Sequence, residues 1–278
     1  MKKILVSGAS GTVGSLLVQA LAGHGESVKA ASRSDRAFEG AEAVRFDYAD
    51  PSTFASAFEG VNRLYLLMPA DNLEIEACLL PVIAFAAERN IKIVMQSVMG
   101  VETEEDNPYR KVELALEASG TRWVILRPNW FADNFHGIWA PAVAHGDIAL
   151  PAGDGASSFI DARDVAACAV AALTSDRFDG QGFTLTGPEP VGYREAAALL
   201  SRAAGRPIAY TPISDGAFVA MLQGGGVPEA NGWMLAGLFA AVREGHTAAV
   251  SSAVESLTGR PPRSLQRYAA DHAAAFIA

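Results

Sequence analysis

Residues 3–14 read KILVSGASGTVG, an apolar run followed directly by three glycines at a spacing of three. The run from Lys3 to Ser7 is short and uninterrupted, which is typical of a buried strand. Beyond these glycines, apolar residues recur at helical spacing until Gly23 and Gly25 interrupt the pattern. The stretch therefore predicts a strand, a glycine turn and a helix in immediate succession.

The glycine turn has the context that a dinucleotide-binding fingerprint requires, because it follows the first strand and opens the first helix. Gly8 permits a tight turn, Gly11 lets the backbone approach a diphosphate, and Gly14 lets the helix pack close to the sheet. Free N–H groups at the helix start would bind the phosphates. The predicted contacts to the cofactor are Gly8, Ser10, Gly11, Thr12, Val13 and Gly14. The alternative is an ordinary glycine-rich turn between strand and helix.

The alternation of strand and helix continues through the first half of the chain. Strands are predicted at 28–32, 43–47, 63–67, 91–97 and 123–127, and helices near 51–58, 73–88 and 109–118. Such alternation implies crossover connections and a parallel sheet. Strands such as LYLLM and IKIVM lack polar alternation, as in a sheet that helices cover on both faces. We therefore predict an α/β fold with a doubly wound, Rossmann-like parallel sheet.

The pattern changes after Asn129, where proline and glycine punctuate a loop-rich stretch. A strand is predicted at 182–186, and helices near 161–174, 193–204, 215–223, 233–243 and 265–276. We predict an NAD(P)-binding domain over residues 1–150. A smaller, mostly helical lobe over residues 151–278 is expected to pack on it and to be partly interleaved with it.

Composition restricts the partners and the compartment of this 278-residue chain. With 22 Lys and Arg against 31 Asp and Glu, the formal net charge of −9 argues against binding nucleic acid. Cys78 and Cys168 lie in apolar stretches, which favours reduced thiols and a cytoplasmic location. We expect neither export nor membrane insertion, because no apolar run approaches the roughly 18 residues of a membrane span. The five histidines lack neighbours at metal-ligand spacing, so no metal is expected.

Arg33 stands at the end of the second predicted strand, where NAD-selective proteins usually offer Asp or Glu to the ribose hydroxyls. A guanidinium there suits a 2′-phosphate, so we expect NADP (NADPH) rather than NAD. Asp35 could partly restore the acidic alternative, and Arg33 could also be a solvated surface residue. Asp47 ends the third predicted strand and is placed to accept a hydrogen bond from the adenine amino group, whereas a helix-capping role fits Asp50 better.

Aromatic residues cluster after the sixth predicted strand, at Trp130, Phe131, Phe135 and Trp139. Beside a cofactor site, such a cluster suggests a flat, aromatic or conjugated substrate that contacts Trp130, Phe131 and Phe135. Aromatic residues also dominate ordinary cores, so packing between the lobe and the first domain is the alternative.

Three further segments make the chain recognisable. They are YRKVELALEASGTRWVILRPNWFADNF at 109–135, PAGDGASSFIDARDVA at 151–166 and LTGPEPVGYREAAALLSRAAGR at 185–206. Together with GASGTVG at 8–14, they make the chain resemble the NmrA-like group of atypical short-chain dehydrogenases/reductases over nearly its whole length. Within that group it is most similar to NAD(P)H quinone or azo-dye reductase-like proteins and to the ergot-alkaloid iminium reductase branch.

The resemblance implies an extended dinucleotide across the carboxyl ends of the strands. It places the ends of the fourth, fifth and sixth predicted strands around the nicotinamide, with Met68, Pro69, Ser97 and Asn129 as contacts. The same edge is where open α/β sheets bind ligands. Ser97 also matches in position the catalytic serine of the wider superfamily, although a serine there could bond only the cofactor or the local backbone.

One departure concerns the Tyr-x-x-x-Lys pair of the wider superfamily, which is absent here. Tyr109 is followed four residues later by Glu113, and it stands where related members carry Lys or His. Lys111 is only two residues along a helix and would point to a different face. Tyr109 and Ser97 are the candidate catalytic residues, with Tyr109 as a proton donor whose phenol would need a partner.

The nicotinamide itself performs hydride transfer, so the protein need only position an electrophile and exclude water. The sequence therefore predicts an NAD(P)H-dependent oxidoreductase of a small, conjugated, electron-poor substrate of the quinone, azo or iminium type. The alternative is a non-catalytic, redox-sensing regulator that binds NAD(P) and acts through protein contacts.

Overall fold

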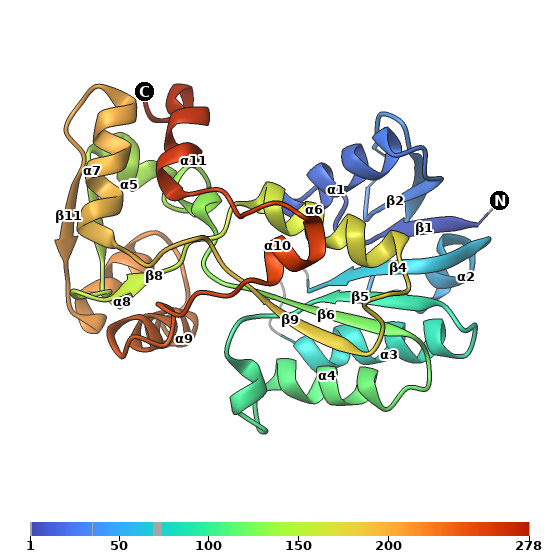
Figure 1. Cartoon of the computed structure of the whole chain (residues 1–278). Helices are drawn as coiled ribbons and strands as arrows, with labels where there is room; N and C mark the ends of the chain where they lie inside the picture. The colour runs from blue at the N-terminus through green and yellow to red at the C-terminus, as the bar shows by residue number, and fades with distance from the viewer. Residues whose placement is uncertain (1, 35, 69–73, 278) are drawn as a thin grey trace. The chain divides into compact units, whose positions relative to one another are not determined.

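Six strands from the first half of the chain and one from the second half form a seven-stranded parallel sheet in the computed structural model of the protein, which describes residues 2–34, 36–68 and 74–277 (Figure 1). The strands run in the order β3-β2-β1-β4-β5-β6-β9, and every neighbouring pair is parallel. Their bounds are β1 (Lys3–Val6), β2 (Val28–Ser32), β3 (Glu42–Arg45), β4 (Val61–Leu67), β5 (Lys92–Gln96), β6 (Trp123–Pro128) and β9 (Gln181–Leu185). The predicted α/β fold is confirmed.

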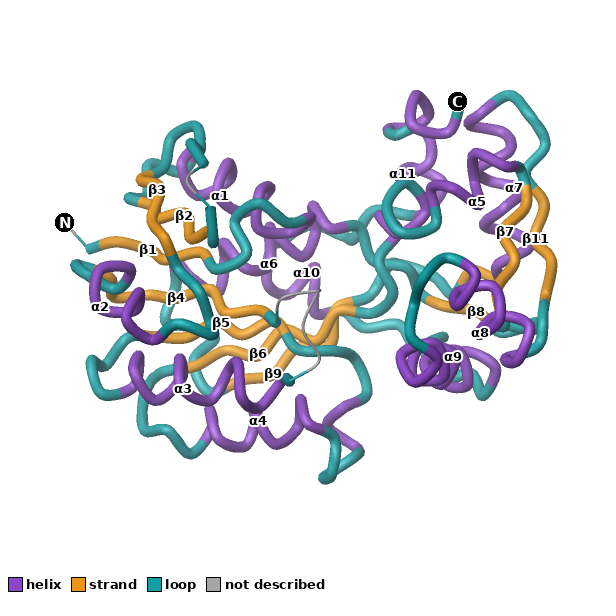
Figure 2. The backbone as a smooth tube through the Cα atoms, turned by 180° about the vertical axis from the view of Figure 1, so that it is seen from behind, coloured by secondary structure: helices purple, strands orange, loops and turns teal. Residues whose placement is uncertain are grey.

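Helices cover both faces of this sheet (Figures 1 and 2). On one face α1 (Thr12–Gly23) lies against α6 (Ala162–Thr174), which also contacts α10 (Ala253–Thr258). On the other face α3 (Ile75–Ala87) lies beside α4 (Pro108–Glu117). The central strands are buried on both sides, which explains their apolar runs. Shorter elements are η1 (Pro51–Thr53), α2 (Phe54–Ala57) and η2 (Val101–Thr103).

The order of the strands reverses between β1 and β4, which pair although β2 and β3 intervene in the sequence. At such a point the flanking connections lead away in opposite directions and open a crevice beyond the carboxyl ends of the strands. The buried hydroxyl of Ser7 donates to the carbonyl of Tyr65 at 2.9 Å and accepts from the N–H of Leu67 at 3.2 Å. It thereby ties the ends of the two strands together where the glycine turn begins.

The chain forms two compact units, each made of three segments. Unit 1 comprises Met1–Pro128, Ala162–Leu185 and Ala253–Arg260 and holds the sheet. Unit 2 comprises Asn129–Asp161, Thr186–Ser252 and Pro261–Ala278. The boundary near residue 150 that the sequence suggests stays a prediction, because compact units are not the same as domains that fold independently.

Unit 2 is built around one apolar core that is rich in aromatic rings. Its helical elements are η3 (Ala132–Phe135), α5 (Ala140–His145), α7 (Tyr193–Ala204), α8 (Asp215–Gly224), α9 (Glu229–Arg243), α11 (Leu265–Asp271) and η4 (Ala273–Phe276). Short strands form two small sheets, in which β7 (Asp147–Leu150) pairs in parallel with β11 (Ala209–Pro212), and β8 (Ala156–Ser157) pairs antiparallel with β10 (Val191–Gly192).

The second half of the chain departs from the sequence prediction in detail. Helix α9 begins at Glu229 rather than at Trp233, and the helix expected over 265–276 divides into α11 and η4. The four short strands of unit 2 and the helices α5 and α10 are not predicted by the sequence. Elements of two to six residues show too little periodicity to be distinguished from loops.

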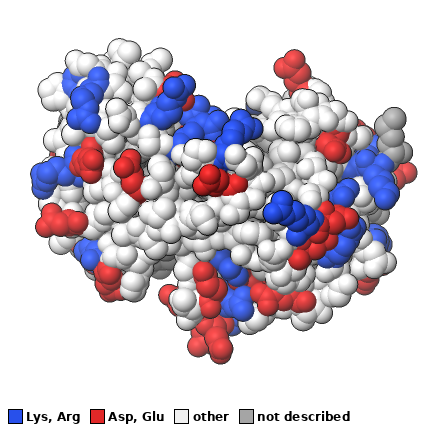
Figure 3. Space-filling view, in the orientation of Figure 1, with Lys and Arg blue, Asp and Glu red and all other residues white. Residues whose placement is uncertain are grey.

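Charged side chains of both signs are dispersed over the face shown in Figure 3, in small groups separated by other residues. Within the described part of the chain, none of the helices is both long and apolar enough to cross a membrane.

Candidate functional site

The glycine turn between β1 and α1 packs tightly at Gly8 and Gly14 and leaves a space, the cradle, beside Gly11. Gly8 has a φ of +61°, in the left-handed region that favours glycine. A Cβ on Gly14 would lie 2.1 Å from the carbonyl oxygen of Gly8, so only glycine lets α1 pack this closely on the turn. Gly11 has an extended backbone, and among the described residues a Cβ there would meet only the Gly8 oxygen, at 3.3 Å.

The N-terminus of α1 opens onto the cradle. Gly11 is its N-cap residue, and no side chain among the described residues caps the helix. The N–H groups of Thr12, Val13 and Gly14 lie in the first turn, where a helix offers them no carbonyl partners of its own. Together with the positive end of the helix dipole, these donors suit an anion such as a phosphate.

The end of β4 lies beside the turn. A Cβ on Gly8 would be 2.9 Å from Cδ1 of Leu67, the last residue of the strand. The hydroxyl of Tyr48 donates to the carbonyl of Leu67 at 2.6 Å, and burial raises the pKa of Tyr48, so this donor stays protonated. Met68 follows directly and packs on the core of unit 1, whereas Pro69 lies outside the described residues. Tyr48 is thus a supporting residue that sequence reasoning misses.

Arg33 follows β2 at the same carboxyl edge of the sheet, and its side chain is exposed. The bend after the strand is held by Ser34, whose N–H donates to the hydroxyl of Ser32 at 3.2 Å. Asp35, the acidic alternative to Arg33 as a ribose contact, lies outside the described residues. Among the described residues, the charged group that directly follows β2 at this edge is therefore the guanidinium of Arg33.

Asp47 follows β3 and is half-buried. Its Oδ1 accepts a hydrogen bond from the N–H of Ala49 at 3.0 Å. Asp50, and not Asp47, caps η1, because its carboxylate accepts from the N–H of Ser52 at 3.1 Å. The carboxylate of Asp47 thus stands at the carboxyl edge without a capping role in η1.

Ser97 follows β5 at this edge, and only 3% of it is exposed. Its N–H donates to the carbonyl of Leu126 at 2.7 Å. Its hydroxyl makes no hydrogen bond of regular geometry within the described residues, but it lies close enough to the carboxylate of Glu113 to favour the ionised form. Ser97 is therefore a buried hydroxyl next to a buried carboxylate.

Glu113, in α4, is fully buried and bound by two arginines. Arg127 of β6 donates from Nε and Nη2 to the two carboxylate oxygens, both at 2.8 Å, and Arg110 donates to Oε2 at 2.9 Å. Burial by itself would raise the pKa of Glu113, but the hydrogen bonds and charges of the arginines hold this pKa below its ordinary value. Gly182 in β9 makes room for the guanidinium, since a Cβ there would lie 2.7 Å from Nη1 of Arg127. The carboxylate joins α4 to β6 as an ion pair.

Sequence reasoning does not find this ion pair. Glu113 draws attention only because it stands where the superfamily has lysine. The signal that could have found its partner is Arg127 itself, a charged residue within the apolar strand WVILRP, since a buried charge requires an opposite charge.

Tyr109 is the second residue of α4, and its N–H donates to the capping side chain of Asn107 at 3.0 Å. It packs on the core of unit 1, and burial raises the pKa of its phenol. Four residues later the helix presents the ion-paired Glu113 and not a cation. The phenol therefore keeps its proton at neutral pH and is a weak acid.

In unit 2, the amide of Asn129 joins three separate segments of the chain. Its Nδ2 donates to the hydroxyl of Ser158 at 2.7 Å and to the carbonyl of Thr247 at 2.8 Å. Its Oδ1 accepts from the N–H of Trp130 at 2.8 Å. The side chain is 5% exposed and is occupied by these protein partners, so it orders the backbone that carries Trp130.

The three predicted substrate residues differ in burial. Phe135 is fully buried and packs against Trp139, with ring centroids 5.1 Å apart. Trp130 and Phe131 are only partly buried, and a backbone bridge joins Phe131 to Ile160. Of these three residues, Trp130 and Phe131 keep some exposed surface, whereas Phe135 lies in the core of unit 2.

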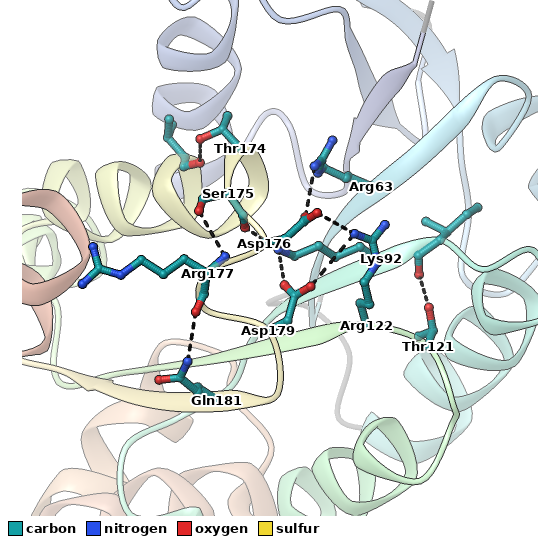
Figure 4. Close-up of polar contacts among 12 residues, drawn as sticks. Arg63, Lys92, Thr121, Arg122, Thr174, Ser175, Asp176, Arg177, Asp179 and Gln181 are labelled. Atoms are coloured by element: carbon teal, nitrogen blue, oxygen red, sulfur yellow. Dashed lines mark hydrogen bonds and ion pairs between the residues drawn. The ribbon is translucent and has the colours of Figure 1, made fainter.

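A second polar cluster lies at the opposite, amino-terminal edge of the sheet (Figure 4). Lys92, the first residue of β5, is fully buried, and its ammonium contacts the carboxylate of Asp179. Asp176 contacts Arg122 at 2.9 Å and Arg63 at 3.2 Å. These ion pairs fasten the segment after α6 to the sheet. Because they lie away from the carboxyl edge, we assign them to stability.

The geometry of the carboxyl edge fits a dinucleotide. The turn leaves space beside Gly11 that a larger side chain would enter, and the uncapped helix start supplies N–H donors for a diphosphate. Arg33 and Asp47 follow the strands on one side of the turn, and Ser97 follows a strand on the other. An extended ligand across a topological switch point requires groups on both sides.

Known proteins share this arrangement. A family model described as NAD(P)H-binding matches residues 8–176. The chain is 34% identical to the uncharacterized oxidoreductase YesF of Bacillus subtilis, over 98% of this chain and 95% of that protein. It is 33% identical to an NAD(P)H azoreductase of Xenophilus azovorans, over 98% and 99% of the two chains. The NADPH-dependent quinone oxidoreductase QOR2 of Escherichia coli, solved in complex with NADPH, matches with a TM-score of 0.85 and 25% identity and covers 96% of this chain and 99% of that one.

The family match covers more than half of the chain and begins at the first glycine of the turn. The relatives align over nearly the full length, so the likeness includes unit 2 as well as the sheet. The resemblance seen in the sequence is confirmed. The chain belongs to the NAD(P)H-binding family, together with oxidoreductases such as the azoreductase.

Proposed function

We propose that this protein is an NADPH-dependent reductase of small, conjugated, electron-poor molecules of the quinone, azo or iminium type. The observation that carries the proposal is the glycine cradle, which leaves room for a diphosphate at an uncapped helix start. The names of two relatives, an NAD(P)H azoreductase and an NADPH-dependent quinone oxidoreductase, support the substrate class.

The reduced nicotinamide supplies a hydride when it is bound. The tasks of the chain are to hold the dinucleotide, orient the acceptor and exclude water. We assign the diphosphate to the turn and the helix start, at Gly8, Ser10, Gly11, Thr12, Val13 and Gly14. We assign the adenine amino group to Asp47, and the nicotinamide to Met68, Pro69, Ser97 and Asn129.

The aromatic group of unit 2 supports the choice of a flat acceptor. Trp130 and Phe131 offer partly exposed rings on a backbone that Asn129 and Ile160 hold in place. Conjugated rings stack on such surfaces, whereas aliphatic substrates gain less from them. We assign acceptor contact to Trp130 and Phe131, with Phe135 supporting them from the core.

The proton chemistry of the site favours the same substrates. Tyr109 has no lysine one turn along its helix, and burial raises the pKa of its phenol. The carboxylate of Glu113 is held ionised by two arginines and has no proton to give at neutral pH. Tyr109 and Ser97 are therefore proposed as hydrogen-bond donors to an acceptor that takes a hydride without strong acid catalysis.

Removal of the Arg33 guanidinium is expected to change cofactor preference. In Arg33→Ala, NADPH binding should weaken about ten- to a hundredfold, because a charge-assisted hydrogen bond contributes roughly 1.5–3 kcal/mol. NADH lacks the 2′-phosphate and should bind as before. Fluorescence titration with both cofactors measures the ratio, and Arg36→Ala, a second exposed arginine of the same loop, is the matched control. An unchanged ratio in Arg33→Ala would remove the basis for NADPH selectivity.

The substrate class is tested with a panel of acceptors and the purified protein. NADPH oxidation is followed with menadione, an azo dye and a cyclic iminium compound, and with butanone as an acceptor that needs acid catalysis. At least one conjugated acceptor should react about a hundredfold faster than butanone, the scale of general acid catalysis that this site does not supply. Faster reduction of butanone would show that the site contains an effective acid. Tight NADPH binding without oxidation by any acceptor would support a redox sensor instead.

A further inference from the structure

The backbone of Trp130 is fixed at both of its polar atoms. Its N–H donates to Oδ1 of Asn129 at 2.8 Å, and its carbonyl accepts from the N–H of Ile160 at 2.9 Å. Two residues on, the N–H of Ala132 donates to the carbonyl of Ile160 at 2.8 Å. These hydrogen bonds hold the backbone of Trp130 in place. Rotation of the side chain is the remaining motion of the indole.

Two rings restrict that side chain. The indole of Trp130 stacks on Phe239 with centroids 5.0 Å apart and planes at 29°, and on Trp139 at 5.7 Å and 28°. The centroids of Trp139 and Phe239 are themselves only 6.5 Å apart. If they sandwiched the indole, their separation would approach the sum of the two stacking distances. Trp139 and Phe239 therefore do not sandwich the indole between them.

Phe239 is itself held firmly, because the end of α9 is fastened to the rest of unit 2. Four residues after Phe239, the guanidinium of Arg243 binds both oxygens of Asp215 at the start of α8, at 2.9 and 3.0 Å. Gly155 lets the helix approach closely, since a Cβ there would lie 2.3 Å from the carbonyl oxygen of Val242. The ring of Phe239 is 2% exposed.

We propose that Phe239 is a positioning residue for the acceptor: it sets the plane of the Trp130 indole, and a flat conjugated acceptor stacks on the opposite face of that indole. The inference rests on the proposed function and deepens it, because it adds a residue of α9 that acts on the acceptor only through Trp130. Loss of the Phe239 ring would let the indole tilt, so the acceptor would meet a stacking surface of variable orientation.

The test compares Phe239→Leu with Phe218→Leu. Phe218 is a matched control, because it is also buried, at 5% exposed, and packs edge-on against Phe239 at 5.5 Å without stacking on Trp130. With NADPH and menadione, Phe239→Leu should raise the KM for menadione about five- to tenfold, the scale of one lost aromatic pair. NADPH affinity should be unchanged in both variants, and Phe239→Tyr, which keeps the ring, should restore the KM.

Equal KM values in Phe239→Leu and Phe218→Leu would overturn the inference, since a purely structural role predicts the same loss for both. Failure of Phe239→Tyr to restore the KM would also overturn it. If the wild-type protein consumes no NADPH with menadione, the proposed function fails separately. The inference is then judged from the quenching of tryptophan fluorescence by menadione. The Trp130→Phe variant shows which part of the quenching comes from Trp130. Weaker quenching affinity in Phe239→Leu than in Phe218→Leu supports the positioning role, and equal affinities contradict it.

Discussion

Replacement of Gly11 by valine is expected to abolish NADPH binding while the protein remains folded. The backbone at Gly11 is extended, with φ −82° and ψ 178°, a conformation that valine adopts without strain. Its Cβ would meet only one described atom, the Gly8 oxygen at 3.3 Å, so the added methyl groups would project into the cradle where we place the diphosphate. Loss of three or more orders of magnitude in affinity is expected, because several charge-assisted hydrogen bonds of roughly 1.5–3 kcal/mol each are lost together.

The matched control is Gly23→Val, at the other end of the same helix, where a Cβ would meet no described atom within 4 Å. Gly14→Ala is a poor substitute for Gly11→Val, because its Cβ would collide with the backbone of Gly8 and would disturb folding as well as binding. Fluorescence titration with NADPH and a thermal unfolding curve separate these effects. Wild-type affinity in Gly11→Val would show that the dinucleotide does not occupy the turn.

Replacement of Glu113 by glutamine is expected to produce the largest loss of stability. The change keeps the shape of the side chain but removes the charge that neutralises Arg127 and Arg110 in a fully buried position. Removal of one partner from a buried ion pair typically costs about 3–5 kcal/mol in the free energy of unfolding. Urea unfolding measures the difference. The control is Glu117→Gln, whose carboxylate also binds Arg110 but is 31% exposed, and which should lose less than about 1 kcal/mol.

The same ion pair predicts how stability depends on pH. The arginines hold the pKa of Glu113 below its ordinary value of 4.5, so the folded state binds its proton less readily than the unfolded chain does. The contribution of the carboxylate is therefore complete above pH 4.5 and is lost as the pH falls through the lower pKa of the folded state. The stability difference between the wild type and Glu113→Gln should shrink on acidification below that range. A difference that stayed constant would contradict the assigned ion pair.

The sheet could be predicted from the sequence because its signals are local. The central strands are apolar runs, such as LYLL at the end of β4, and the first helix begins within the glycine turn, at Thr12. The roles of Gly8 and Gly14 in the turn follow from general backbone geometry, and the structure shows the positive φ at the first and the close helix packing at the second. The same turn and Arg33 predicted the cofactor class, and resemblance to a known family then indicated the kind of substrate.

The supporting contacts could not be predicted, because they join residues that are far apart in the sequence. Nothing near Trp130 indicates that Phe239 packs on it, and nothing near Glu113 indicates which strand carries its arginine. Aromatic residues at Trp130 and Phe135 look alike in the sequence, yet one is partly exposed and the other is in the core. Burial depends on tertiary packing, so only the structure distinguishes a surface for stacking from the core that supports it.

The central claim is that NADPH bound at the glycine turn reduces a conjugated acceptor. The most direct test is the stoichiometry of a single reaction, in which NADPH and menadione are incubated with the wild-type protein without oxygen and both are quantified. A hydride and a proton convert one quinone to one hydroquinone, so the account predicts one NADPH consumed for each menadione reduced, and no reaction with Gly11→Val. Tight binding of NADPH with no consumption of either reactant would contradict the claim.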